Sequence, residues 1–177
     1  NLTRAVLAAN PDAFEDKGFL TYLLETGASR HYRNSSIPEQ LLQATLLKPS
    51  MEKPEHWLMP LFRYQLHTEL QAAYSQRQLL GWYLNSANFG NFAYGFDAAG
   101  LVYFGKHAER LSLAEIAILA ALPLYPDRNP LDNPVDARVM QEIVLDNMVA
   151  QGLITMEDAR SALSERLEVR QGIREAM

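Results

Sequence analysis

The sequence LLGWYLNSANFGNFAYGFDAAGLVYFGK, at residues 79–106, contains two helical patterns separated by a turn rich in glycine. The first pattern continues from a serine N-cap, Ser75, and predicts a helix over residues 76–87. The segment NFGNFAYG carries two glycines and is typical of a turn. The following FDAAGLVYF predicts a second helix. This stretch therefore favours a helical domain.

The residues after this stretch continue the helical pattern. Ser112 and Glu115 form the signature of a capping box at the start of LSLAEIAILAAL. PLYPDRNPLDNP is predicted to be a proline-rich loop without regular structure. A long helix is predicted over residues 135–151, and Thr155 with Asp158 begins another.

The residues before this stretch also predict helices. RAVLAAN reads as a short helix, and a second helix begins near Pro11. GASRHYRNSS is a polar loop, and Pro38 fits the first turn of the next helix. KPSMEKPEH is a loop, followed by a helix from Trp57 to Tyr74. With no convincing strand, the sequence predicts one all-α domain over residues 1–177.

Composition excludes several classes of partner and site. The chain has 177 residues and a net charge of 16 − 21 = −5, and it shows no basic stripe, which argues against a nucleic-acid partner. The absence of cysteine excludes disulfides and thiolate metal sites. The most apolar run, IAILAALPL, is half the length of a membrane span of ~20 residues. The chain starts without methionine, so we expect a fragment of a longer protein, in which any membrane anchor would lie upstream.

Several motifs occur in an order that resembles a known family. RQLLGWYLN, YGFDAAGLVYFGK, LSLAEIAILAALPLYP and VLDNMVAQGLIT resemble glycosyltransferase family 51, the peptidoglycan glycosyltransferases of penicillin-binding proteins, which polymerise lipid II. The resemblance implies a lysozyme-like helical domain in an extracytoplasmic, membrane-associated protein. It also implies a lipid-linked glycan or peptidoglycan ligand and a protein partner in cell-wall assembly. Taken alone, Asn85, Gly90, Gly95 and Glu115 have ordinary structural roles as hydrogen-bonding, turn and capping residues.

The first family motif, E-D-x-x-F-x-x-H-x-G, corresponds to EDKGFLTYLLETG. Glu15, Asp16 and Phe19 match it, whereas Tyr22 stands where the histidine is expected. The resemblance implies that Glu15 is the general base. It takes a proton from the acceptor's sugar hydroxyl as that oxygen attacks the anomeric carbon of the donor, whose configuration is inverted. The alternative interpretation is an ordinary acidic pair near a helix N-terminus.

The second family motif, G-G-S-T-I-T-Q-Q-L, corresponds to RNSSIPEQLLQA. Ser35, Ser36 and Gln40 fit the motif, and Arg33 replaces the first glycine. The segment between the first two motifs is shorter than is usual for the family, which implies a shortened membrane-facing subdomain. The candidate substrate-binding residues are Asp16, Arg33, Ser35, Ser36, Gln40 and Arg63.

The third family motif, R-K-x-x-E, falls without gaps on MPLFR at residues 59–63. The two cations are missing, and Arg63 replaces the second glutamate. Because the lipid pyrophosphate leaves as an anion, its transition state needs cations or a divalent metal. Arg63 could bind a phosphate directly, or it could be a solvated loop charge. We expect no cofactor, except a divalent metal if the domain is active, and no histidine has metal-ligand spacing.

Three functional hypotheses follow. The first is a weakly active or inactive domain retained as a binding or scaffolding module, with a cleft that is shortened or filled by Tyr22 and Phe62. The second is an active inverting glycosyltransferase with Glu15 as base. The third is a glycan hydrolase, which needs a second carboxylate across the cleft. The carboxylates that could serve are Asp16, Glu39 and Glu52.

Overall fold

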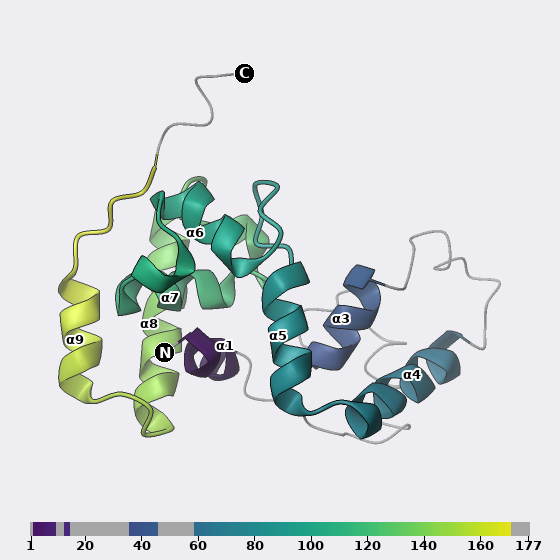
Figure 1. Cartoon of the computed structure of the whole chain (residues 1–177). Helices are drawn as coiled ribbons and strands as arrows, with labels where there is room; N and C mark the ends of the chain where they lie inside the picture. Colours follow the sequence, from purple (N-terminus) through teal and green to yellow (C-terminus); the bar gives the residue numbers. More distant parts are fainter. Residues whose placement is uncertain (1, 10–12, 15–35, 46–58, 171–177) are drawn as a thin grey trace. The chain divides into compact units, whose positions relative to one another are not determined.

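The computed structural model describes residues 2–9, 13–14, 36–45 and 59–170, and these form helices joined by turns (Figure 1). Within these residues the β-structure is limited to one isolated antiparallel bridge, between Asn88 and Tyr94. The all-α prediction is therefore confirmed. The chain divides into two compact units, Asn1–Pro11 with Asn88–Met177 as unit 1, and Asp12–Ala87 as unit 2. One family domain over residues 1–177 stays a prediction.

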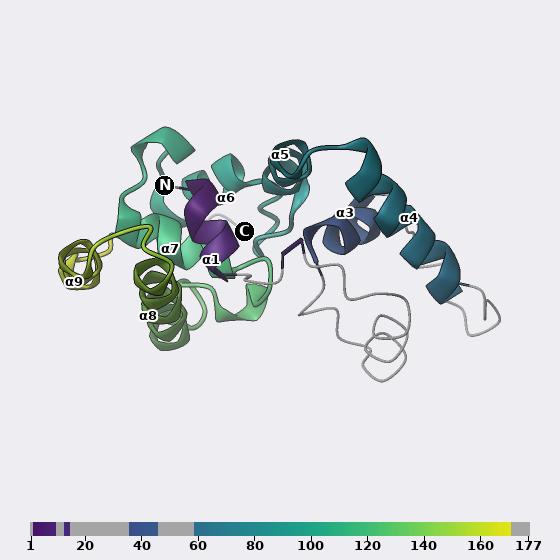
Figure 2. The ribbon, with the colours of Figure 1, turned by 90° about the horizontal axis from the view of Figure 1, so that it is seen from below.

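Unit 1 is built around α7 (Leu113–Ala121), whose residues from Ala114 onward are all buried. A helix that is apolar on all sides is stable only when other helices cover it. The other elements are α1 (Leu2–Ala9), α6 (Phe96–Phe104), η3 (Ala108–Arg110), η4 (Pro126–Arg128), α8 (Pro134–Ala150) and α9 (Met156–Ser164). Among the described residues, α7 packs against α1, α6, α8 and α9 (Figures 1 and 2).

Local signals set the ends of these helices. Ser112 and Glu115 form the predicted capping box of α7. Thr155 and Asp158 begin α9 as predicted, and they also form a capping box. The segment PLYPDRNPLDNP corrects a prediction, because it contains the 3₁₀ turn η4 where no regular structure was expected. Pro126 begins this turn, and its ring fixes φ near the value that a helical turn requires.

Unit 2 contains α3 (Ile37–Thr45), α4 (Met59–Ala73) and α5 (Gln76–Ser86). Ser75 is the N-cap of α5, as predicted, and it forms a capping box with Gln78. α3 packs against both α4 and α5. Ile37 and Leu42 of α3 are fully buried, and Leu79 of α5 is nearly so.

Of the helix predicted to begin near Pro11, the structure describes only residues 13–14, which form a turn, and the rest lies outside the described residues. Across the described ranges, none of the helices combines the length and the apolar character that crossing a bilayer requires.

Candidate functional site

Unit 2 carries a polar stripe along one face of α4. Arg63, His67 and Gln71 follow one another at intervals of four residues, which places them on the same side of a helix. Arg63 and His67 are each only 5 % exposed. Buried charged or polar side chains are usually held by hydrogen bonds, so this face of α4 is specified by polar as well as apolar contacts.

The imidazole of His67 links α4 to the start of α3. Its Nε2 lies 2.9 Å from the hydroxyl oxygen of Ser36, the residue directly before α3. Gln71 Nε2 approaches the same ring nitrogen at 3.4 Å and donates to the carbonyl of Phe14 at 3.5 Å. The ring of Tyr64 stacks beside His67 with centroids 6.5 Å apart. The contacts with Gln71 and Tyr64 orient the imidazole ring, which in turn contacts the Ser36 hydroxyl.

Three of the predicted site residues belong to the described part of unit 2. Ser36 contacts His67, and Arg63 lies one helical turn before His67 on α4. Gln40 lies on α3, where its backbone N–H donates to the Ser36 carbonyl at 3.0 Å. The remaining predicted site residues lie outside the described residues: Glu15, Asp16, Arg33 and Ser35.

Arg63 is a helical residue with a buried side chain, so its interpretation as a solvated loop charge is wrong. Phe62 is 48 % exposed, which does not fit the expectation that it fills a cleft. Its proposed neighbour in that cleft, Tyr22, lies outside the described residues. That Arg63 binds a phosphate stays a prediction.

Sequence reasoning missed His67, which was considered only as a metal ligand. The signal was present in its spacing, because polar residues at positions 63, 67 and 71 repeat with helical period inside a segment already predicted to be a helix. A polar stripe of this kind indicates a face that packs against other polar groups. The burial of His67 could not be derived from that pattern, since it depends on where α3 packs.

The described part of the site does not fit a divalent metal ion. It offers a buried guanidinium, a hydroxyl, an imidazole and amides, whereas divalent metals in glycosyl transfer need several carboxylate or similar oxygen ligands. Within the described ranges no group of three histidine, cysteine or acidic side chains could hold a metal. We therefore derive no step through a metal.

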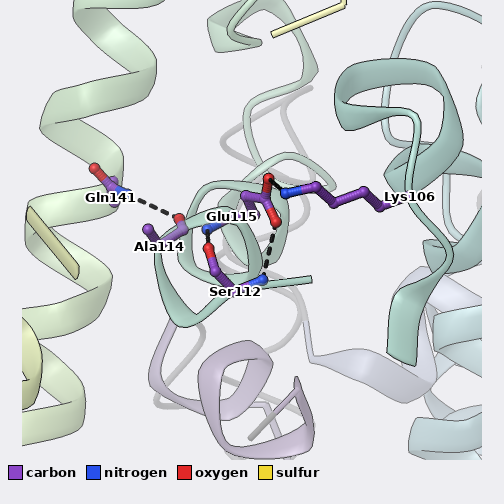
Figure 3. Close-up of polar contacts among 5 residues, drawn as sticks. All are labelled: Lys106, Ser112, Ala114, Glu115 and Gln141. Atoms are coloured by element: carbon purple, nitrogen blue, oxygen red, sulfur yellow. Dashed lines mark hydrogen bonds and ion pairs between the residues drawn. The ribbon is translucent and has the colours of Figure 1, made fainter. Parts of the chain in front are cut away.

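A second polar cluster lies in unit 1 at the start of α7 (Figure 3). The carboxylate of Glu115, with a side chain 2 % exposed, forms an ion pair with Lys106 at 2.7 Å and accepts from the Ser112 backbone N–H at 2.9 Å. The hydrogen bond to Glu115 raises the pKa of Lys106. Gln141 of α8 donates to the Ala114 carbonyl at 2.8 Å.

The structural roles predicted for four motif residues are confirmed. Glu115 closes a capping box, and Asn85 donates back to the Gly81 carbonyl at 2.8 Å within α5. Gly90 and Gly95 have φ values of 82° and 88°, which glycine adopts far more readily than other residues. These motif residues therefore stabilise the fold.

Comparison with known proteins gives consistent matches. The family model described as transglycosylase matches residues 13–149. Penicillin-binding protein 1A of Neisseria cinerea is 35% identical over 134 residues, which cover 75% of this chain and 16% of that protein. The protein of the same name from Aquifex aeolicus is 39% identical over 106 residues, covering 59% of this chain and 15% of that protein.

A solved structure agrees with these sequence relatives. The crystal structure of penicillin-binding protein 1A from Haemophilus influenzae matches with a TM-score of 0.52 and 26% identity, covering 76% of this chain and 16% of that one. The chain thus spans about a sixth of the length of the proteins it matches.

Proposed function

Because this chain belongs to the transglycosylase family, glycosyltransferase family 51, we propose that it is a divergent, weakly active or inactive domain that binds lipid-linked glycan or peptidoglycan. In this role it serves as a binding or scaffolding module for cell-wall assembly. An extracytoplasmic, membrane-associated location, reached through a flanking segment, and a protein partner belong to the same proposal.

The burial of Arg63 is the observation that carries this proposal. Transfer of a sugar from a lipid pyrophosphate needs cations that reach the leaving group as negative charge develops on it. Arg63 replaces the family's second glutamate and was the leading candidate to supply such a charge. Its exposure of only 5 % supports a role in stabilising unit 2 rather than in contacting a pyrophosphate in solvent.

The start of α4 supports the same conclusion. The helix begins at Met59, so residues 59–63 form its first turn, and Met59 and Pro60 stand where the family carries arginine and lysine. A continuous helix through these positions supports the alignment without gaps. Neither side chain can stabilise a phosphate anion, because neither carries a charge or a hydrogen-bond donor.

An active inverting glycosyltransferase that polymerises lipid II is the second candidate. The observation in its favour is that the family match begins at residue 13 and includes Glu15, Asp16 and Phe19, the part of the first motif that is present. In this candidate Glu15 acts as the general base on the acceptor hydroxyl.

Polymerisation of labelled lipid II by the purified chain tests the proposal, with and without divalent metal. The variant is Glu15→Gln, and the matched control is Glu69→Gln, which makes the same change at an exposed position on α4. We expect little or no polymer from any of the three proteins, and equal binding of lipid II by all three. Glycan chains made by the unchanged chain and the control, but lost with Glu15→Gln, would establish the active enzyme instead.

A further inference from the structure

The turn at residues 88–94 in unit 1 displays an aromatic side chain to solvent. Phe92 is 93 % exposed, and Tyr94 is 62 % exposed. Exposed aromatic residues are common singly, but Phe92 also has an unusual backbone, with φ at 59°, next to Asn91 with φ at 47°. A bulky residue in the left-handed region is a rare outlier, because its Cβ crowds the following carbonyl.

The turn gains no internal stability from Phe92. A side chain that is almost fully exposed buries little apolar surface, and a glycine would adopt the same φ without strain. Local strain that brings no packing benefit is a recognised feature of binding and catalytic sites. Phe92 therefore has the properties of a residue retained for contact with a ligand.

The turn is held rigidly despite this strain. Asn88 pairs with Tyr94 in an isolated bridge, and Phe89 N–H donates to the Ala93 carbonyl at 2.9 Å. The Tyr103 hydroxyl donates to the Phe89 carbonyl at 2.8 Å and accepts from Asn91 Nδ2 at 3.2 Å. A rigid turn loses little conformational entropy when a ligand binds to it.

The side chains around Phe92 are neutral and polar. Asn88, Asn91 and Tyr94 are exposed, and the sequence has no charged residue between Arg77 and Asp97. Within the part of the chain that the structure describes, the Asn88 amide nitrogen, the Asn91 amide oxygen and the Tyr94 hydroxyl make no hydrogen bond. These groups offer both donors and acceptors to a ligand.

We propose that Phe92 stacks against a sugar ring of a glycan strand, with Asn88, Asn91 and Tyr94 bonding its hydroxyl and acetamido groups. The C–H face of a pyranose is apolar and matches an aromatic ring, while its rim carries neutral polar groups that match amides and a phenol. The inference rests on the proposed function and adds the chemistry and place of a second glycan contact, in unit 1.

A lipid bilayer fits this turn less well. Segments that bind membranes usually combine apolar residues with lysine or arginine, which attract anionic headgroups. The turn has no basic residue. Bilayer binding is therefore the alternative outcome of the test below.

Binding of chitotetraose, a neutral N-acetylglucosamine oligomer, by titration calorimetry tests the inference on the 177-residue chain. Phe92→Gly removes the ring and the backbone strain together, so the variant should unfold at the same temperature or higher. We expect its affinity to fall about tenfold, as the loss of one aromatic contact implies. Phe92→Trp should retain binding. Val135→Ala is the control, because it trims an apolar residue that is 75 % exposed on α8.

The outcomes separate this inference from the proposed function. Equal affinity of the unchanged chain and Phe92→Gly would overturn the stacking site while leaving glycan binding intact. No binding of chitotetraose or of lipid II by the unchanged chain would overturn both. A second experiment measures the binding of the same proteins to phosphatidylcholine vesicles. Loss of vesicle binding with Phe92→Gly, without loss of chitotetraose binding, would overturn the sugar site and assign Phe92 to a bilayer.

Discussion

Glu115 shows how one buried carboxylate can stabilise a helix without acting in catalysis. It accepts from the Ser112 backbone N–H and pairs with Lys106, and its side chain is 2 % exposed. Glu115→Ala removes both interactions and leaves the partly buried Ser112 N–H without its acceptor. We expect a loss of about 1–3 kcal/mol in the free energy of unfolding, measured by urea denaturation.

Asp158→Ala is the matched control for this prediction. Asp158 occupies the same position of the capping box at the start of α9, but it is exposed to water. Water can replace its hydrogen bonds to Thr155. The free energy of unfolding should therefore fall clearly less for Asp158→Ala than for Glu115→Ala. Equal losses would mean that burial adds nothing to the capping box of α7.

Tyr103 makes stability depend on pH in the alkaline range. Burial raises its pKa from 10.0 to about 12. Because the folded state holds the phenol proton more tightly than the unfolded chain, its contribution is complete below pH 10 and is lost as pH rises from about 10 to about 12. Unfolding free energies of the unchanged chain and Tyr103→Phe should therefore converge across that range. If the difference between these two free energies stayed constant from pH 10 to pH 12, the pH dependence would not come from Tyr103.

Residue roles that depend on near neighbours in the sequence were predictable. The capping box at Ser112 and the helix start at Thr155 require only residues three positions apart, and both predictions are confirmed. The contact between His67 and Ser36 joins residues 31 positions apart, so no local pattern specifies it. The burial of Arg63 was missed for the same reason.

At the scale of elements, two glycines inside helices test how closely the backbone is packed. A Cβ added at Gly100 of α6 would lie 2.6 Å from the Lys106 carbonyl oxygen and 3.2 Å from Leu111 Cδ1. A Cβ at Gly81 of α5 would meet nothing within 4 Å. A glycine is therefore needed at position 100, because the backbone at Lys106 and the side chain of Leu111 pack directly against it. Packing does not require a glycine at position 81.

Gly100→Ala should destabilise the protein by about 1–3 kcal/mol, because the backbone after α6 must move to admit a methyl group. Gly81→Ala should stabilise it by about 0.5–1 kcal/mol, since alanine loses less entropy in a helix. In thermal unfolding, the midpoint temperature should fall for Gly100→Ala and rise for Gly81→Ala. The packing argument fails if Gly100→Ala unfolds at the same temperature as the unchanged chain or higher.

Helices were predicted better than the connections between them. An apolar run behind a capping box marks α7, and a 17-residue helical pattern marks α8. Both helices begin and end within about two residues of their predicted bounds. The 3₁₀ turn η4 was missed because proline and asparagine suppress any periodic signal in a segment of three residues. Single turns such as this form when flanking helices fix their ends.

At the scale of the whole molecule, the sequence predicted one domain, and the structure shows two compact units within the chain. Unit 1 joins the first eleven residues to the second half of the sequence, with α1 packed against α7 and α8. Periodicity identifies each helix but does not say which helices share a core. The division into units follows from contacts between distant segments, such as Asn147 of α8 and the Ala8 carbonyl.

Amide hydrogen exchange on His67→Ala tests whether the two units open separately. The substitution removes the buried imidazole that contacts Ser36, which should destabilise unit 2 by about 1–3 kcal/mol. If each unit has its own core, exchange should accelerate in α3, α4 and α5 while α7 and α8 keep their protection. The equivalent change in unit 1, Glu115→Ala, should produce the reverse pattern. Equal acceleration in all helices of either variant would instead mean that the chain unfolds as one cooperative domain, as its sequence predicts.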